Sequence, residues 1–254
     1  MNACTDRKTE SREVSRQSGF TLLELIIVLF ISLVITGIAI PRFVQTMRNL
    51  RLAGDGRNIA ETLGQAKMRA AADFTDARAY FDFATGTYRV DVWDKPNSCW
   101  MPDHGTDVNG VTLAVGCLGP GGGPGGGVVP GMNLSANVSF AGSAASPAVL
   151  ATVGAPPPNS QPAIAQAPPC RAGTAGGATP ADGPWQGATF ANSACVVFNS
   201  RGVPIQKGPG GIAPTSNDVV YVTDGNNLYG LTVSQTGLIR TWSTPATGAN
   251  WFRR

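Results

Sequence analysis

The chain turns apolar at Gly19-Phe20-Thr21-Leu22-Leu23-Glu24, the start of a run that stays almost wholly apolar from Phe20 to Ile40. As an α-helix this run spans roughly 31 Å, about the thickness of the hydrocarbon core of a bilayer. One acidic residue, Glu24, lies inside the run. Burial of an unpaired carboxylate in hydrocarbon is costly, so the run predicts a membrane-spanning helix whose acid has a specific partner.

Two common kinds of N-terminal segment explain only part of this pattern. Basic residues precede the run, which predicts a cytoplasmic N-terminus and an exported remainder. A cleavable secretory signal normally has a shorter apolar region followed by its small-residue cleavage site, whereas Ser18 and Gly19 precede the run here. A plain membrane anchor explains the length of the run but neither Glu24 nor the junction before Phe20.

The stretch from Ser18 to Val28 resembles the type III signal of type IV pilins and pseudopilins. In that family a membrane-embedded aspartyl peptidase, the prepilin peptidase, cuts after the glycine and methylates the new N-terminus. The resemblance implies a leader peptide over residues 1–19, cleavage between Gly19 and Phe20, and N-methylation of Phe20. It also implies that Glu24 acts in filament assembly and that Pro41 is the proline that kinks the helix.

An electrostatic pairing between filament subunits would explain why Glu24 lies in an apolar segment. Glu24 of one subunit can pair with the positively charged N-terminus of a neighbour, which neutralises both groups in a medium of low dielectric constant. Pro41 removes one helix hydrogen bond and is expected to bend or loosen the helix near the bilayer exit.

The resemblance also implies partners and a location. The expected partners are the prepilin peptidase, other pilins or pseudopilins, the inner-membrane assembly platform and membrane lipid. The expected location is a single-pass inner-membrane protein with a periplasmic C-terminal domain, later part of a filament.

Beyond the transmembrane helix of residues 20–41, a second helical pattern covers residues 42–75. Apolar residues recur there at three- or four-residue steps, which predicts an amphipathic helix packed on a globular domain. Gly54-Asp55-Gly56 interrupts this pattern, and two glycines so close cost roughly 2 kcal/mol relative to alanine. We expect a kink or break there, or alternatively a surface loop that joins two helices.

After residue 76 the apolar periodicity becomes alternating, which is typical of strands. The predicted strands are residues 79–83, 88–93, 194–198, 218–222, 228–233 and 238–242, with turns at 84–87, 199–202, 224–227 and 235–237. One long helix followed by an antiparallel sheet gives the expected fold class, α+β, with a β-rich periplasmic domain over residues 76–254.

A segment rich in glycine, proline and alanine interrupts the strand pattern over residues 119–188. Its first part, residues 119–127, holds only glycine and proline and cannot be a helix or a central strand. Residues 141–188 are poor in charge. We expect an extended surface insertion that is partly disordered.

The chain has five cysteines, and cleavage after Gly19 would remove Cys4. An even number in an exported chain suggests two disulfides. Nearest-neighbour pairing gives Cys99–Cys117 and Cys170–Cys195, although three connectivities are possible. Reduced, buried thiols in a cytosolic protein are the alternative.

The order of elements narrows the resemblance to one branch of the pilins. Residues 18–93 and about 190–242 resemble the GspH/FimT type, which comprises minor pseudopilins of type II secretion and minor pilins of type IV pili. The later part rests on Phe198-Asn199-Ser200-Arg201-Gly202 and on the stretch from Val233 to Arg240. The resemblance implies a structural subunit that acts in filament initiation or tip assembly and in protein secretion, not an enzyme.

A DNA-binding minor pilin of an uptake system is the alternative. The FimT branch includes subunits that bind DNA through a C-terminal Gly-Arg-x-Arg-like motif, and here Leu238 replaces the first arginine. A net charge of +3 is too small to argue for nucleic acid by itself. Cations and an aromatic ring near the C-terminus could still bind single strands, or form only a solvated basic tail. These candidate DNA contacts are Arg240, Trp242, Arg253 and Arg254.

The sequence indicates no catalytic residue, no metal and no cofactor. The single histidine, His104, lies in a predicted loop without further ligands at zinc spacing and without the partners of a catalytic triad. Residues 224–227 could offer oxygen atoms to calcium, but a hairpin turn is the favoured interpretation. An anchored periplasmic enzyme is a third hypothesis, motivated only by the insertion and its loop acids.

Overall fold

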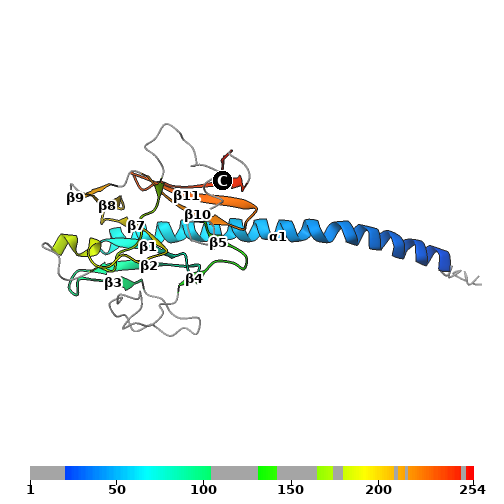
Figure 1. Cartoon of the computed structure of the whole chain (residues 1–254), viewed down its shortest axis with the longest axis horizontal. Helices are drawn as coiled ribbons and strands as arrows, with labels where there is room; N and C mark the ends of the chain where they lie inside the picture. The colour runs from blue at the N-terminus through cyan, green and yellow to red at the C-terminus, as the bar shows by residue number, and fades with distance from the viewer. Residues whose placement is uncertain are drawn as a thin grey trace, which may run out of the picture. The chain divides into compact units, whose positions relative to one another are not determined.

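The computed structural model describes residues 21–103, 131–141, 165–173, 180–208, 211–214, 217–246 and 250–254. The chain divides into two compact units, one ending at Gln45 and the other running from Thr46 to Arg254. The helix α1 (Leu22–Ala72) contributes residues to both units, and all described strands belong to the second (Figure 1).

Helix α1 begins with a side-chain cap and runs without interruption to Ala72. The hydroxyl of Thr21 accepts a hydrogen bond from the backbone N–H of Glu24 at 3.2 Å, which satisfies one of the free donors at the helix start. Pro41 lies inside the helix. The predicted break at Gly54-Asp55-Gly56 is wrong, because these residues are helical.

Packing at Asp55 and Gly56 stabilises this part of α1. A Cβ atom at Gly56 would lie 3.1 Å from the ring of Tyr229, so the missing side chain lets that ring approach the helix closely. The buried carboxylate of Asp55 accepts hydrogen bonds from the backbone N–H and the hydroxyl of Ser135, both at 3.0 Å. These contacts offset the low helix propensity of glycine, which costs about 1 kcal/mol per residue.

Two sheets, rather than the single predicted sheet, surround the second part of α1. The first has the strand order β3-β2-β1-β7-β8-β9, with β4 paired to β2, and all of its pairs are antiparallel. Its strands are β1 (Ala77–Asp82), β2 (Thr87–Asp94), β3 (Cys99–Pro102), β4 (Met132–Asn133), β7 (Ser193–Phe198), β8 (Pro204–Gly208) and β9 (Gly211–Pro214).

The second sheet has the order β13-β12-β11-β10-β5, and β6 pairs with β10 in parallel. Its strands are β5 (Ser139–Phe140), β6 (Ala165–Gln166), β10 (Asn217–Thr223), β11 (Asn227–Ser234), β12 (Ile239–Pro245) and β13 (Phe252–Arg253). A 3₁₀ helix, η1 (Pro180–Trp185), precedes β7 in the chain.

One main hydrophobic core joins α1 to a face of each sheet. Ile59 and Leu63 of the helix pack with residues such as Val196 of the first sheet and Leu231 of the second. Figure 1 shows β1 and β2 on one side of this part of α1 and β10 and β11 on the other. Because side chains alternate along a strand, each sheet keeps an outer face, and each outer face carries a smaller apolar cluster of its own.

The α+β class is confirmed, and all six predicted strands are present to within a few residues. The short strands β3 to β6, β8, β9 and β13 were not predicted. The insertion is not wholly a surface feature, because β6 pairs with β10 and the side chains of Ala167 and Cys170 are buried. The glycine- and proline-only stretch at 119–127 lies outside the described residues.

Candidate assembly segment and surface sites

The first part of α1 presents an apolar surface. Every residue from Thr21 to Leu50 is exposed, including large aliphatic and aromatic side chains. The most apolar window has a mean hydropathy of 2.8 and none of it is buried, which distinguishes it from the core helix of a globular domain. By length and composition this helix could cross a membrane, a test that a signal sequence near the N-terminus also passes.

Two hydroxyl side chains in this segment form hydrogen bonds within their own helix. The hydroxyl of Ser32 donates to the carbonyl of Val28, and that of Thr36 donates to the carbonyl of Ser32, both at 2.7 Å. Such bonds allow hydroxyls to sit in hydrocarbon. The carboxylate of Glu24 has no hydrogen-bond or ion-pair partner among the described residues.

Residues 14–40 match the family model of the prokaryotic N-terminal methylation motif. The chain carries a type IV pilin-like prepilin signal. No curated protein and no solved structure matches the chain. The matched range includes the predicted junction of Gly19 and Phe20 as well as Glu24, and it ends one residue before Pro41.

The structure places the later part of this prepilin signal in the first turns of α1. Thr21 caps the helix and Glu24 lies in its first turn, next to the end of the chain that cleavage would create. Gly19 and Phe20 themselves lie outside the described residues. The Glu24 carboxylate would therefore lie close to the N-terminus if the chain were cleaved after Gly19. Cleavage and methylation themselves stay predictions.

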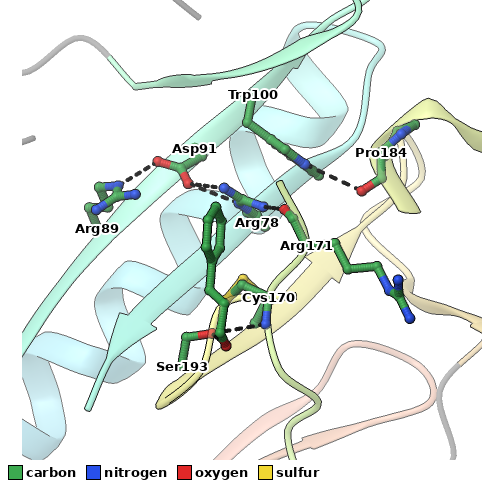
Figure 2. The surroundings of a disulfide bond; sticks show 10 residues. Arg78, Arg89, Asp91, Trp100, Cys170, Arg171, Pro184 and Ser193 are labelled. Atoms are coloured by element: carbon green, nitrogen blue, oxygen red, sulfur yellow. Dashed lines mark hydrogen bonds and ion pairs between the residues drawn. A yellow bond between two sulfur atoms is a disulfide. The ribbon is translucent and has the colours of Figure 1, made fainter. Parts of the chain in front are cut away.

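One of the two predicted disulfides is present. Cys170 and Cys195 are bonded, with their Cα atoms 4.9 Å apart, on the outer face of the first sheet (Figure 2). Cys99 is also disulfide-bonded. Its predicted partner, Cys117, lies outside the described residues.

A buried charge cluster beside this disulfide was not predicted. Arg78 is 1% exposed, and its Nε and Nη2 atoms both lie 2.8 Å from Oδ2 of Asp91. Nε of Arg89 lies 2.8 Å from the other oxygen of the same carboxylate (Figure 2). Burial lowers the pKa of the Arg78 guanidinium, and the charge and hydrogen bonds of Asp91 oppose that shift.

The register of the predicted hairpin contains the signal for this cluster. Arg78 and Asp91 are directly opposite in the antiparallel β1–β2 pair. Matching residues of the two strands one by one from the hairpin turn outward therefore places this arginine beside this aspartate. Alternation then places both on the face away from α1. Trp100 completes the site, with the Arg78 guanidinium 4.3 Å from the centre of its ring.

The structure brings three of the four candidate DNA-contact residues together. Arg253 is directly opposite Trp242 in the β12–β13 pair, and Arg240 lies two residues from Trp242, so all three share one face. Arg254 belongs to the other face, where its Nε donates to the hydroxyl of Ser243 at 2.8 Å. The four residues therefore do not form a single surface.

Trp242 is a poorer stacking platform than the sequence indicated. Its Nε1 donates to the hydroxyl of Thr232 at 3.0 Å, and its ring is partly buried against the cluster that contains Tyr221 and Trp251. Trp251 is itself buried. Neither ring presents a fully open face for a nucleobase.

No group of three or more metal-binding side chains occurs among the described residues. His104 lies outside them. In the β10–β11 hairpin, Oδ1 of Asp224 accepts bonds from the backbone N–H of Asn226 at 2.9 Å and of Asn227 at 2.7 Å. This carboxylate thus caps a turn, in agreement with the hairpin predicted at residues 224–227.

Proposed function

We propose that the chain is a minor pseudopilin or minor pilin, a structural subunit of a type II secretion pseudopilus or a type IV pilus. The match of residues 14–40 to the methylation motif carries this proposal. The exposed apolar helix and the α+β domain support it. Such a subunit waits in the inner membrane with its domain in the periplasm, and then enters a filament at or near its tip.

The local geometry suggests how the prepilin signal works in assembly. Cleavage after Gly19 creates a positive α-amino group just before the cap residue Thr21. The carboxylate of Glu24, unpartnered within the described residues, can receive such an amino group from a neighbouring subunit. The exposed apolar side chains then pack against copies of the same helix instead of lipid.

The processing step is tested by intact-mass measurement of the protein extracted from membranes. The expected mass is that of residues 20–254 plus one methyl group, with the cysteines oxidised. Any other mature N-terminus, or an unmethylated Phe20 in cells that hold an active prepilin peptidase, would overturn the assignment.

Assembly is tested with Glu24→Ala. We expect the variant to be inserted and cleaved normally but to be absent from filaments, because the neighbour's amino group loses its counter-charge. Glu61→Ala, which removes another exposed glutamate from α1, is the matched control and should assemble. Pull-down of tagged filaments reports both variants, and normal incorporation of Glu24→Ala would refute the pairing.

DNA binding is the second candidate function, favoured by the shared face of Arg240, Trp242 and Arg253. Binding of the full chain in detergent to single-stranded DNA should then weaken steeply with salt and fall with Arg240→Ala. Arg201→Ala, which removes an exposed arginine from the β7–β8 turn, is the control. Equal loss in both variants, or no binding at low salt, would remove this candidate.

A further inference from the structure

Helix α1 is basic where it continues beyond the apolar run. Between Pro41 and Ala60 it carries four arginines and one acid, and no acid lies between Glu24 and Asp55. Lysine and arginine are normally concentrated on the cytoplasmic side of a membrane span, not on the exported side. The positive charge of this stretch is therefore unusual for an exported domain, and the proposed pairing of Glu24 does not use it.

Arg48 and Arg51 are two cations of this stretch whose side chains are exposed and have no hydrogen-bond or ion-pair partner among the described residues. Arg42, earlier in the helix, has an interaction of its own. Asp55, four residues after Arg51, is buried, and its carboxylate accepts two hydrogen bonds from Ser135. The acid of this stretch is thus occupied inside the domain.

Exposed apolar side chains accompany these arginines. Met47 and Leu50 are 39% and 62% exposed, and their three-residue spacing makes them neighbours on the helix surface. Phe252 of β13 is 57% exposed and lies beside the same part of α1, because it lines a hollow of about 210 Å³ together with Asn49 and Leu52. Arginines next to exposed apolar side chains are typical of a segment that lies at a membrane interface.

A bilayer would lie within reach of this surface. Along an α-helix, Arg48 and Arg51 are about 12 Å and about 16 Å beyond Ile40, the end of the apolar run. Headgroups occupy roughly the first 5–7 Å beyond the hydrocarbon. Attraction between charges extends about 8 Å further at physiological ionic strength. Arg48 falls within this range and Arg51 at its edge, and their long side chains extend the reach.

We propose that this basic surface docks on the anionic headgroups of the bilayer that anchors the chain. Lipid phosphates bind the guanidinium groups of Arg48 and Arg51, whose planar geometry suits phosphate. Met47, Leu50 and Phe252 enter the boundary between headgroups and acyl chains. The contact holds the domain at the membrane until the subunit is drawn into a filament. This role rests on the membrane anchoring of the proposed function.

The test measures which lipids surround the full chain in vesicles. The chain is reconstituted in phosphatidylcholine that contains about one third phosphatidylglycerol, an anionic lipid. Electron paramagnetic resonance then compares the immobilised fractions of spin-labelled phosphatidylglycerol and spin-labelled phosphatidylcholine. We expect phosphatidylglycerol to associate at least about two-fold more strongly at low salt, and this preference to shrink as the salt concentration rises.

Charge variants connect the lipid preference to the two arginines. Arg48→Gln/Arg51→Gln should lose most of the preference, whereas Arg48→Lys/Arg51→Lys keeps both charges and should keep most of it. Arg201→Gln, which removes an exposed arginine from the β7–β8 turn, is the matched control and should behave as the unmodified chain does.

A second pair of variants tests whether β13 takes part. Phe252→Glu places an acid on the proposed surface and should weaken the preference for phosphatidylglycerol. Phe74→Glu makes the same change at an exposed phenylalanine that follows the other end of α1, and should leave the preference unchanged. Equal effects of the two variants would contradict the proposed surface.

The remaining outcomes separate this proposal from the membrane anchor itself. Equal association of both lipids with a chain that resists carbonate extraction would overturn the lipid contact alone. So would an unchanged preference in Arg48→Gln/Arg51→Gln, or an equal loss in Arg201→Gln. A chain that carbonate removes from the vesicles would overturn the anchor and the lipid contact together.

Discussion

Burial of Asp76, between α1 and β1, raises the pKa of its carboxyl to about 6, and the nearby charge of Lys95 only partly opposes that shift. The folded state therefore binds this proton more tightly than the unfolded state does, because the ordinary pKa of the group is 3.8. Stability gained from protonation is complete below about pH 4 and is lost as the pH rises through about 6.

Asp76→Asn should remove this dependence on pH. We expect the variant to be more stable than the unmodified chain at pH 7, by roughly 1–3 kcal/mol, and to show a flatter stability profile between about pH 4 and pH 6. Urea unfolding at several pH values measures both effects. Asp73→Asn, which removes an exposed carboxylate three residues away, is the control. Parallel pH profiles for the unmodified chain and Asp76→Asn would contradict the prediction.

At the scale of single residues, the sequence was most informative where a residue type was unusual for its surroundings or had few possible partners. Glu24 stood out because an acid in an apolar run needs a reason, and the Cys170–Cys195 pair followed from spacing. Arg78 was missed because an arginine in a strand usually faces water. Its burial depends on Trp100 and on the segment held by the disulfide, and local sequence does not reveal either contact.

Two glycines of neighbouring turns meet at Lys67 of α1. Nζ of Lys67 donates to the carbonyl of Gly237 at 3.0 Å, and a Cβ atom at Gly237 would lie only 2.5 Å from the carbonyl oxygen of Gly202. The β7–β8 turn and the β11–β12 turn are therefore joined across the two sheets. These are the turns of the two late motifs on which the GspH/FimT resemblance rests.

Gly237→Ala tests this contact, and Gly225→Ala is its control. Both glycines have positive φ, 73° and 86°, but nothing lies within 4 Å of a Cβ atom at Gly225. Both variants should lose about 1 kcal/mol from backbone strain, and Gly237→Ala should lose roughly 1–3 kcal/mol more from the clash. Denaturant unfolding measures the difference, and equal losses would show that the turns do not need to meet.

At the scale of elements, long periodic patterns were predicted well and short or interrupted ones were not. The six long strands alternate clearly, whereas β8 (Pro204–Gly208) begins with proline and β3 (Cys99–Pro102) ends with it. Gly54 and Gly56 indicated a helix break because helix propensity includes only the free-energy cost of glycine in an isolated helix. It does not include contacts with the rest of the domain. Tyr229 and Ser135, both distant in sequence, supply the contacts that keep α1 intact.

For the molecule as a whole, the Cys170–Cys195 disulfide should contribute measurably to stability. It closes a loop between residues 25 positions apart, for which loop-closure entropy gives about 3.5 kcal/mol. The double variant Cys170→Ala/Cys195→Ala should lose about that much in urea unfolding. Substitution is preferable to a reductant, because Cys99 is also disulfide-bonded and would be reduced too. An unchanged urea midpoint would contradict the prediction.

The central pairing of the first sheet has a consequence for how the domain folds. β1 pairs with β2 through a short turn, but its other neighbour is β7, with Ala77 opposite Phe198. The chain must therefore be made to Phe198, more than three quarters of its length, before this strand finds both partners, and such distant pairing slows folding. Loop-closure entropy rises only with the logarithm of length, about 0.6 kcal/mol for each doubling. A longer or shorter insertion between β3 and β7 would thus change how quickly the domain folds far more than how stable it is.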